Sequence, residues 1–334
     1  MVASRARNAL VALAALWALP GCKATPPEAL HPDQPVPSPV PAFVFAEEVA
    51  IFVGHPAVRI VDARPGRDYR RQHIPGAVPL QWTELRERGG GLMTGRLDDD
   101  ADYLAEVVGA RGISRDHWVI VVGDPTEHWG EEARVAWVLK YLGHERVSVL
   151  DGGMGAWTAA GLPTQRGRVR YPAEAYRPEV DESVLARKAD VRQFSDDVDS
   201  WQTVLVDVRS TGEYRGGPGA PRYGAPRAGR IPGAVHLPWR VLLEEDGSLR
   251  PAETLREVLI PRGIRPDAEI ITYCTGGVRS AHTWYVLTSL GYPNVRNYGG
   301  SWWEWSIDRR LPIENGAPEP LPYRLPPFPL TAEE

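Results

Sequence analysis

Cysteine is scarce in this chain of 334 residues, which has only Cys22 and Cys274. Two cysteines allow at most one disulfide and cannot supply a four-cysteine zinc site. The sequence also lacks a His-Glu-x-x-His pattern, which excludes another common zinc site. A disulfide framework is therefore excluded, and each cysteine needs an explanation of its own.

Runs of positive charge and long apolar segments are missing as well. The formal net charge is -5, from 38 Lys and Arg against 43 Asp and Glu. No basic run appears, so nucleic acid is not an expected partner. After residue 22 no segment is apolar enough to cross a bilayer. The length and the ordinary apolar and charged fractions predict a globular protein of two domains.

The N-terminus has the pattern of a processing signal. Arg5 and Arg7 precede an apolar run from Ala9 to Leu19, which is too short to span a bilayer and has the size of a signal-peptide core. The run ends in Leu19-Pro20-Gly21-Cys22, which resembles a bacterial lipobox and makes Cys22 the expected lipid attachment site. The alternative is a plain secretory signal with an incidental cysteine.

A lipid on Cys22 would hold the protein to the cell envelope on the periplasmic side. Lys23 stands where an inner-membrane retention signal would usually carry Asp, which favours the outer membrane. Residues 23–41 are rich in proline and lack apolar periodicity, so we expect a semi-rigid tether. Apart from the lipid anchor we expect no contact with the membrane.

The rest of the chain consists of two copies of one sequence repeat. Four blocks recur in the same order: residues 59–64 and 204–209, 73–78 and 230–235, 119–122 and 269–272, and 151–153 and 299–301. The duplication predicts a first domain over 42–166, a linker over 167–182, a second domain over 183–315 and a proline-rich tail over 316–334.

Within each unit, short β-branched runs alternate with helical patterns. The runs at 60–61, 119–122 and 270–272 predict buried strands. Apolar residues at helical spacing predict helices over 131–142 and 280–290, each stopped by a glycine. This alternation predicts an α/β fold in which helices flank a mainly parallel sheet. In such sheets ligands bind beyond the carboxyl ends of the strands.

One of these strand ends carries residues for covalent chemistry. The expected strand leads directly into the loop Cys274-Thr275-Gly276-Gly277-Val278-Arg279, and a helix follows. A thiol at a helix start lies near the positive end of the dipole and near unpaired N–H groups. Gly276 and Gly277 can adopt positive φ, which lets N–H groups form an anion nest. Arg279 adds a permanent positive charge.

All of these effects favour the thiolate, which is the nucleophile. Cys274 and Arg279 are therefore the predicted catalytic residues. The alternative is that Cys274 is a small buried hydrophobe and that Arg279 is a solvated residue at the helix start. Neither glycines nor a neighbouring cation are needed for a packing cysteine, so the functional interpretation is favoured.

The body of the chain resembles the rhodanese family in its tandem form, which includes thiosulfate and mercaptopyruvate sulfurtransferases. The motifs that carry the resemblance are Asp207-Val208-Arg209, Glu213-Tyr214, Gly229–Ala234, the Cys274 loop and Asn297–Trp302. The resemblance implies a catalytic Cys at the start of a six-residue loop in the second domain, and an inactive first domain. In that first domain, Asp124 stands about where its cysteine would be.

The resemblance also implies a double displacement that needs no metal or organic cofactor. The Cys274 thiolate would attack the outer sulfur of thiosulfate, and sulfite would leave. A thiophilic acceptor, such as cyanide or a thiol, would then take the sulfur from the Cys274 persulfide. The expected substrates are thus a small anionic sulfur donor and this acceptor. The expected binding residues are Thr275, Gly276, Gly277, Val278, Ser280, Asp207, Arg209 and Trp239.

Some of these residues have a structural alternative. Asp207 and Arg209 are matched by Asp62 and Arg64 in the other repeat, so an internal ion pair is equally plausible. Trp239 can equally belong to the core. His282 is expected to pack or to be solvated rather than to act as a base. Packing is also expected for the tryptophans near the end of the second domain: Trp302, Trp303 and Trp305.

Three other activities stay open. A phosphatase or arsenate reductase would have five residues between its Cys and its Arg, whereas four separate Cys274 from Arg279, which favours sulfur transfer. A mercaptopyruvate sulfurtransferase tends to have Gly after the Cys and Thr at the loop end, where this chain has Thr275 and Arg279. A non-enzymatic sulfur-relay or binding module is the third alternative, because a fold does not fix a function.

Overall fold

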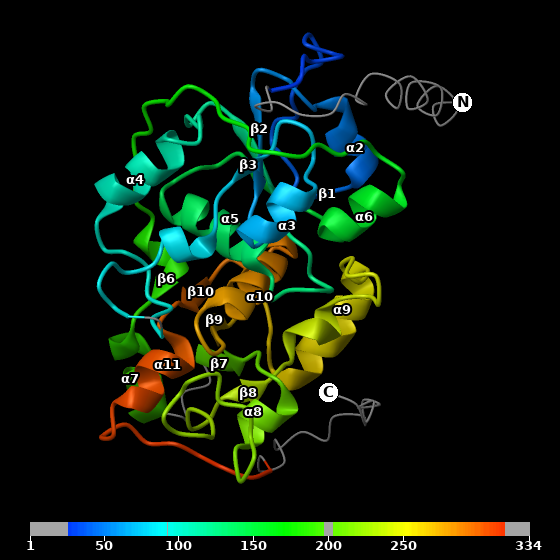
Figure 1. Ribbon diagram of the computed structural model, residues 1–334. Helices are drawn as coiled ribbons and strands as arrows, with labels where there is room; N and C mark the ends of the chain where they lie inside the picture. Colours follow the sequence, from blue (N-terminus) through cyan, green and yellow to red (C-terminus); the bar gives the residue numbers. More distant parts are fainter. Residues whose placement is uncertain (1–25, 92, 197–202, 318–334) are drawn as a thin grey trace. The chain divides into compact units, whose positions relative to one another are not determined.

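The computed structural model describes residues 26–91, 93–196 and 203–317, which form two compact units (Figure 1). Unit one comprises the chain up to Leu85, Asp100–Val180 and Glu245–Ser248. Unit two comprises Arg86–Asp99, Asp181–Glu244 and the chain from Leu249 onward. Each repeat thus forms the bulk of one unit, and one short segment of each belongs to the other unit.

Each unit contains a five-stranded sheet, and the two sheets have the same topology. In unit one the order is β1 (Phe43–Val44), β5 (Val147–Leu150), β4 (Trp118–Val122), β2 (Val58–Asp62) and β3 (Val78–Pro79). In unit two it is β6 (Leu185–Ala186), β10 (Val295–Tyr298), β9 (Glu269–Tyr273), β7 (Thr203–Asp207) and β8 (Val235–His236). All of these pairings are parallel. The predicted duplicated α/β fold is confirmed.

Helices connect the strands in both units. Those of unit one are α2 (Ala46–Ile51), α3 (Gly66–Arg71), η1 (Trp82–Glu84), α4 (Ala101–Gly109), α5 (Glu131–Tyr141) and α6 (Gly153–Ala159). Those of unit two are η2 (Glu182–Val184), α7 (Lys188–Asp196), α8 (Thr211–Arg215), η3 (Trp239–Leu242), α9 (Ala252–Leu259), η4 (Ile260–Arg262), α10 (Val278–Ser289) and α11 (Ser301–Ile307). In the part of the chain described, no helix is both long and apolar enough for a membrane span.

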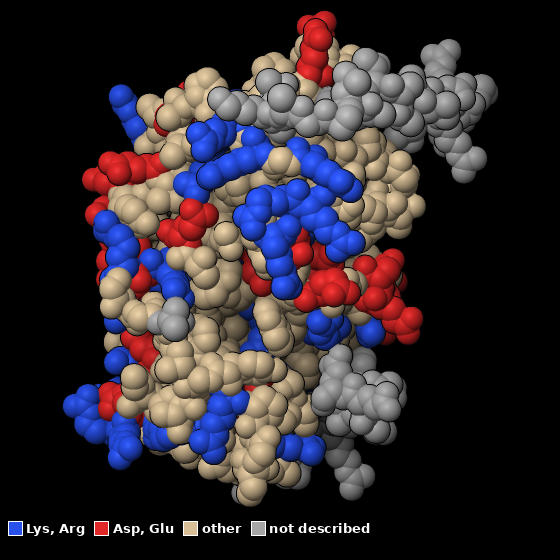
Figure 2. Space-filling model, in the orientation of Figure 1, with Lys and Arg blue, Asp and Glu red and all other residues tan. Residues whose placement is uncertain are grey.

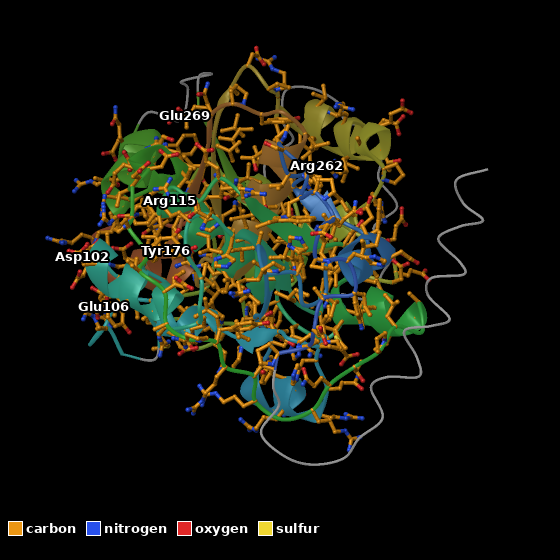
Figure 3. All side chains as sticks on the ribbon, turned by 90° about the horizontal axis from the view of Figure 1, so that it is seen from above. Asp102, Glu106, Arg115, Tyr176, Arg262 and Glu269 are labelled. Carbon is orange, nitrogen blue, oxygen red and sulfur yellow. The ribbon has the colours of Figure 1, made fainter. Side chains whose placement is uncertain are left out.

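The core of unit one lies between its sheet and its helices. Val58 and Ile60 of β2 and Ile120 of β4 pack in one apolar cluster with residues of α2 and α6. On α4, Leu104 is buried, whereas Asp102 and Glu106 lie on the outer side of the helix (Figure 3). This division follows the helical period, which places residues two apart on opposite sides of the helix.

The expected linker packs against unit one. Val169 is 1% exposed, and its amide donates to the Tyr69 hydroxyl at 3.0 Å. Tyr176 stacks on His144 with ring centroids 5.8 Å apart, near Arg115 (Figure 3). Burial raises the pKa of Tyr176, so its hydroxyl stays neutral. The segment as far as Val180 is therefore a folded part of unit one.

The expected tether is described from Pro26 onward, and it too contacts unit one. Pro27 is buried beside Gly54 and Gly76, and Val36 and Val40 pack against the apolar core. This differs from a semi-rigid tether that stands away from the folded domain, because these side chains bury apolar surface instead of leaving it in water. Cys22 lies outside the described residues.

Candidate active site

The loop Cys274–Gly277 connects the carboxyl end of β9 to the start of α10. Its two glycines serve different purposes. Gly277 has φ +80°, the left-handed conformation that glycine adopts without strain. Gly276 instead lies against Trp303, and a Cβ at Gly276 would come within 2.3 Å of that ring. The expected positive φ thus occurs at one glycine, and the other allows a close approach.

Cys274 is 1% exposed, and its Sγ faces donors at the start of α10. The Gly277 amide donates to Sγ at 3.1 Å, and the Ser280 hydroxyl oxygen lies 3.7 Å from Sγ. Burial alone raises the pKa of this thiol. The charge of Arg279 and hydrogen bonds from Ser280 and Gly276 outweigh burial, so the pKa lies below its ordinary value. The site therefore favours the nucleophilic thiolate.

Arg279 is buried and held by a carboxylate. Its Nη1 and Nη2 donate to the two carboxylate oxygens of Glu213, each at 2.8 Å. Nη2 also lies 2.7 Å from the Thr275 hydroxyl oxygen, and that hydroxyl donates to Glu213 at 2.6 Å. Burial opposes ionisation of Glu213, but Arg279 outweighs it and holds the pKa of Glu213 at about 2. With both terminal nitrogens engaged by Glu213, Arg279 acts on the thiol through its charge.

Glu213 is a site residue to which sequence analysis assigned no role. It forms a capping box with Ser210 at the start of α8, and this local pattern is visible in the sequence. Its pairing with Arg279 spans 66 residues and depends on how β7 and β9 lie side by side. The Glu213-Tyr214 motif was the one available signal, but it did not reveal the partner.

Residues at the start of α11 form hydrogen bonds with the backbone of the Cys274 loop. The Cys274 amide donates to the Ser301 hydroxyl oxygen at 3.1 Å. The amides of Trp302 and Trp303 donate to the carbonyls of Cys274 and Thr275, each at 3.0 Å. Trp302 and Trp303, expected only to pack, therefore also hold the loop backbone in place. Ser301 was not predicted, because nothing local in the sequence links it to the loop.

Asp207 and Arg209 form an internal ion pair. Arg209 Nη2 lies 2.6 Å from the Asp207 carboxylate and donates to the Gly229 carbonyl at 2.8 Å. Asp62 and Arg64 form the same 2.6 Å pair in unit one. All four side chains are buried. Of the two expected roles, the geometry favours bracing of the strand ends over contact with substrate.

The remaining predicted residues occupy different environments. Trp239 is 3% exposed and packs edge-on against His282, with ring centroids 5.2 Å apart, so it is a core residue. Burial lowers the pKa of His282 to about 4, which leaves it neutral. Val278 is the first residue of α10 and is buried. Ser280 donates to Asn297 at 2.7 Å, so Asn297 positions the hydroxyl that faces the thiol.

The equivalent loop of unit one, between β4 and α5, has Gly123 at the nucleophile position. Gly123 follows β4 as Cys274 follows β9. The Gly123 carbonyl accepts from the Met154 amide at 2.8 Å, as the Cys274 carbonyl accepts from Trp302. Asp124 therefore lies one residue beyond the position expected for it. The loop of unit one, residues 123–130, is longer than Cys274–Gly277, and neither Gly nor Asp can form a persulfide.

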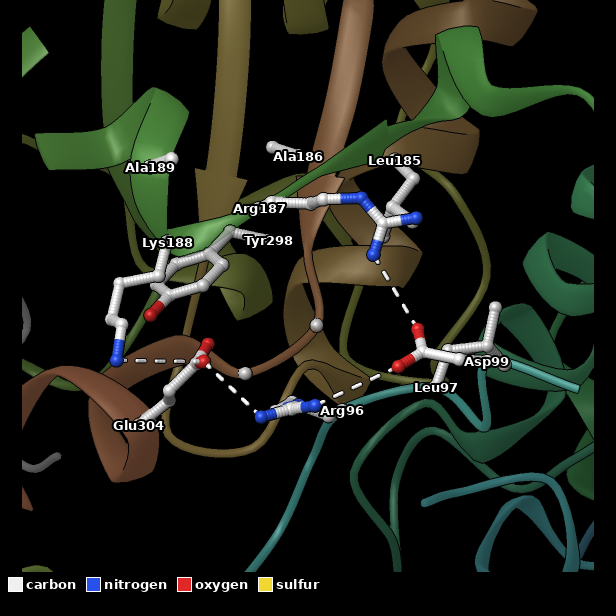
Figure 4. Close-up of a pocket in the computed structure, with 12 residues that line it drawn as sticks. Arg96, Leu97, Asp99, Leu185, Ala186, Arg187, Lys188, Ala189, Tyr298 and Glu304 are labelled. Atoms are coloured by element: carbon white, nitrogen blue, oxygen red, sulfur yellow. Dashed lines mark hydrogen bonds and ion pairs between the residues drawn. The ribbon is translucent and has the colours of Figure 1, made fainter. Parts of the chain in front are cut away.

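A separate cavity of about 240 Å³ lies in unit two beside Gly299 and Gly300 (Figure 4). Arg96 and Lys188 pair with Glu304 there, at 3.8 Å and 4.0 Å. Since its cations have carboxylate partners and its lining excludes the thiol, the candidate site stays at the catalytic loop. The described residues include no group of three His, Cys, Asp or Glu that could hold a metal ion.

A family model for the rhodanese-like domain matches the chain twice, over residues 46–160 and 190–308. This chain belongs to the rhodanese family. Because the two matches follow one another along the chain, the protein is a tandem rhodanese, and the resemblance found in the sequence is confirmed.

Relatives of this tandem rhodanese are named for sulfur transfer and for sulfur carriage. A putative thiosulfate sulfurtransferase of Mycobacterium tuberculosis is 37% identical over 82% of this chain and 90% of the relative. The thiosulfate sulfurtransferase of Corynebacterium glutamicum is 34% identical over 86% and 93%. The sulfur carrier protein TtuD of Thermus thermophilus is 38% identical over 74% and 87%. The chain is therefore a member of a sulfurtransferase family.

Solved structures share the fold of this rhodanese. The anaerobic ergothioneine biosynthesis enzyme of Chlorobium limicola, in complex with trimethyl histidine, matches with a TM-score of 0.73 and 26% identity, covering 83% of this chain and 71% of that one. The structure of YnjE matches with a TM-score of 0.69 and 27% identity, covering 78% and 63%. A structure of EanB was determined with one of its cysteines as a persulfide.

Proposed function

We propose that this protein transfers a sulfane sulfur from thiosulfate to a thiophilic acceptor through a persulfide on Cys274. The environment of the Cys274 thiol is the observation that supports this proposal most strongly. Cys274 is buried, yet its pKa is lowered by a nearby cation and by hydrogen bonds, and the Gly277 amide lies 3.1 Å from Sγ. A packing cysteine would have its pKa raised by the same burial.

The reaction divides into two displacements. In the first, the Cys274 thiolate forms a bond to the outer sulfur of thiosulfate. The sulfur–sulfur bond of thiosulfate breaks, and sulfite leaves with the bonding electron pair. In the second, cyanide or a thiolate attacks the outer sulfur of the persulfide, and the Cys274 thiolate is regenerated. The N–H and O–H donors at the start of α10 stabilise negative charge on sulfur in both steps.

Two observations support thiosulfate as the donor. Arg279 places a permanent positive charge beside the thiol, which suits a dianion. Several relatives carry the name thiosulfate sulfurtransferase. A phosphatase is less well supported, because four residues separate Cys274 from Arg279 where a phosphatase loop would have five. Mercaptopyruvate is the second donor to be tested.

A second candidate function is that of a sulfur carrier, which passes its persulfide sulfur to a partner protein. The 38% identity to the sulfur carrier protein TtuD favours it. A carrier would form the same persulfide on Cys274, but it would turn over slowly with small acceptors. The two functions therefore differ in the second displacement.

We also propose that Cys22 is lipidated and anchors the protein at the periplasmic face of the outer membrane. The positive segment, the short apolar run and the lipobox-like Leu19–Cys22 support this location. Metabolic labelling with palmitate should mark the full chain and should not mark a Cys22→Ser variant. Equal labelling of both would contradict the proposal.

Thiocyanate formation tests the function most simply. The chain from Lys23 onward, which keeps every residue that the structure describes, should form thiocyanate from cyanide and thiosulfate. Cys274→Ser should lower the rate at least about a thousandfold, because it removes the covalent intermediate. Asp124→Asn in the inert loop is the matched control and should leave the rate unchanged. Turnover that persists in folded Cys274→Ser would contradict the mechanism.

A further inference from the structure

Six exposed arginines lie together on unit one. Three belong to α3 and three follow α6: Arg67, Arg70, Arg71, Arg166, Arg168 and Arg170. No carboxylate occurs between Asp151 and Glu174, and α3 has only Asp68. Figure 2 shows basic side chains gathered over the region of α3. We call these six residues the arginine face.

Packing brings the two segments of the arginine face together. Gln165 and His73 form an antiparallel bridge with hydrogen bonds of 2.8 and 2.9 Å. Four residues farther along, the Val169 amide donates to the hydroxyl of Tyr69 on α3. Val169 is buried, whereas the arginines on either side of it are exposed. The chain after α6 therefore lies against α3 with its arginines outward.

Most of these arginines have no carboxylate partner. Elsewhere on the surface, Arg88 pairs with Asp98 at 2.8 Å and Arg187 pairs with Glu182 at 3.0 Å. Within the described residues, five arginines of the face have no carboxylate oxygen within 4.0 Å, and the sixth reaches Asp68 at 3.5 Å. Clustered like charges repel one another, so this cluster is suited to an anionic surface outside the molecule.

The first described residues lie beside the arginine face. Pro27 and the Tyr171 hydroxyl both lie against Gly76, since a Cβ at Gly76 would be 2.8 Å from one and 3.1 Å from the other. Tyr171 directly follows Arg170. Five residue steps connect Cys22 to Pro27, and they reach about 18 Å at most. A lipid on Cys22 would therefore bring the arginine face to the bilayer surface.

We propose that the arginine face binds the phosphates of anionic phospholipids and holds unit one against the membrane. The planar guanidinium group binds phosphate through two parallel hydrogen bonds, and each basic residue near an anionic bilayer adds to the attraction. This contact supplements the lipid anchor, which was the only membrane contact expected from the sequence. It does not depend on the sulfur-transfer reaction.

Vesicle sedimentation tests this contact without the lipid anchor. The chain from Lys23 onward is mixed with vesicles of phosphatidylcholine, with or without phosphatidylglycerol, at low salt. Binding should require phosphatidylglycerol and should weaken as salt screens the charges. Arg166→Ala/Arg168→Ala/Arg170→Ala should bind about a hundredfold more weakly. Arg192→Ala/Arg256→Ala/Arg309→Ala removes the same charge from exposed positions of unit two and should bind as the wild type does.

Three results would overturn the proposal. They are equal binding by the two triple variants, equal binding to both kinds of vesicle, and binding to a single-stranded oligonucleotide without binding to vesicles. Thiocyanate formation and the melting temperature report whether each variant is folded. If the first triple variant does not fold, Arg70→Ala/Arg71→Ala on α3 replaces it and should weaken binding about tenfold or more. Unchanged binding by that pair would likewise overturn the proposal.

Discussion

The loops after β4 and β9 end in the same backbone conformation but differ in the charge of a neighbouring side chain. Each ends at a glycine in the left-handed conformation, Gly130 with φ +83° and Gly277 with φ +80°. The second residue of the following helix is Glu132 in unit one and Arg279 in unit two. Burial, reinforced by neighbouring carboxylates, raises the pKa of Glu132 to about 8. Near neutral pH, unit one therefore has mostly a carboxylic acid where unit two has a cation.

A helix start is common to both loops and therefore does not distinguish them. Both loops precede a helix and its unpaired N–H groups. In unit one, however, the Glu132 side chain fills the space beside Gly123, where a Cβ would come within 1.7 Å of Oε2. In unit two the Cys274 thiol occupies the equivalent place near Arg279. The residue that follows the strand and the charge at the second helical position together distinguish the loop of unit two from the loop of unit one.

Removing the charge of Arg279 should make the loop of unit two electrostatically more like the loop of unit one. We expect this change to have the largest effect on the rate among the predictions that follow. Arg279→Gln/Glu213→Gln deletes the buried pair without leaving one charge unpaired. The pKa of Cys274 should rise towards its ordinary value, because Arg279 is its main stabilising neighbour. Near neutral pH, the rate of persulfide formation should fall about tenfold for each unit of that rise.

The pH profile distinguishes this effect from a general loss of structure. The double variant should recover much of its rate at high pH, where the thiol ionises without help. Arg88→Gln/Asp98→Asn removes another ion pair of unit two and should leave the profile in place. With saturating thiosulfate, a uniform loss of rate at every pH in the Arg279 variant would contradict its role in lowering the pKa of Cys274.

Glu132, in the helix that follows the loop of unit one, should make the free energy of unfolding depend on pH. The folded-state pKa of Glu132, about 8, exceeds its ordinary value of 4.5. The folded protein therefore binds this proton more tightly than the unfolded chain does. The resulting stability is complete below pH 4.5 and is lost as pH rises through about 8. Between these values the contribution of Glu132 to the free energy of unfolding should fall by up to about 1.4 kcal/mol per pH unit.

Glu132→Gln should remove this pH dependence, because Gln stays neutral. Urea unfolding from about pH 5 to about pH 8 measures it, and the variant should exceed the wild type in stability only towards the higher pH. Glu106→Gln, on the exposed side of α4, is the control and should behave as the wild type. The same pH dependence in Glu132→Gln as in the wild type would show that Glu132 is ionised in the folded protein.

Ser280→Ala should have the smallest effect of these variants. It measures how much the Ser280 hydroxyl lowers the pKa of Cys274. The variant loses the hydroxyl that lies 3.7 Å from Cys274 Sγ but keeps Arg279 and the Gly277 amide. The pKa of Cys274 should rise less than it does without Arg279, and the rate near neutral pH should fall less than about tenfold. Ser289→Ala at the end of the same helix should cause no change. An effect as large as that of the Arg279 variant would mean that the hydroxyl dominates.

Local patterns in the sequence predicted the fold and the centre of the site. The strand, Cys274, the two glycines and Arg279 are contiguous, so their arrangement follows from β9 and α10 alone. Glu213, Asn297 and Ser301 come from other segments, and their contacts depend on tertiary packing. The arginine face was missed for the same reason, since no basic run exists in the sequence. Residues 26–41 and the linker were predicted from proline content, which does not show what their apolar side chains contact.

The central claim is that Cys274 carries the sulfur as a persulfide. The most direct measurement is the intact mass of the chain from Lys23 onward after incubation with thiosulfate in the absence of an acceptor, together with peptide mapping. We predict a gain of one sulfur atom on the peptide that contains Cys274, release of sulfite, and return to the original mass when cyanide is added. A free and titratable Cys274 thiol that gains no sulfur from thiosulfate would contradict this account.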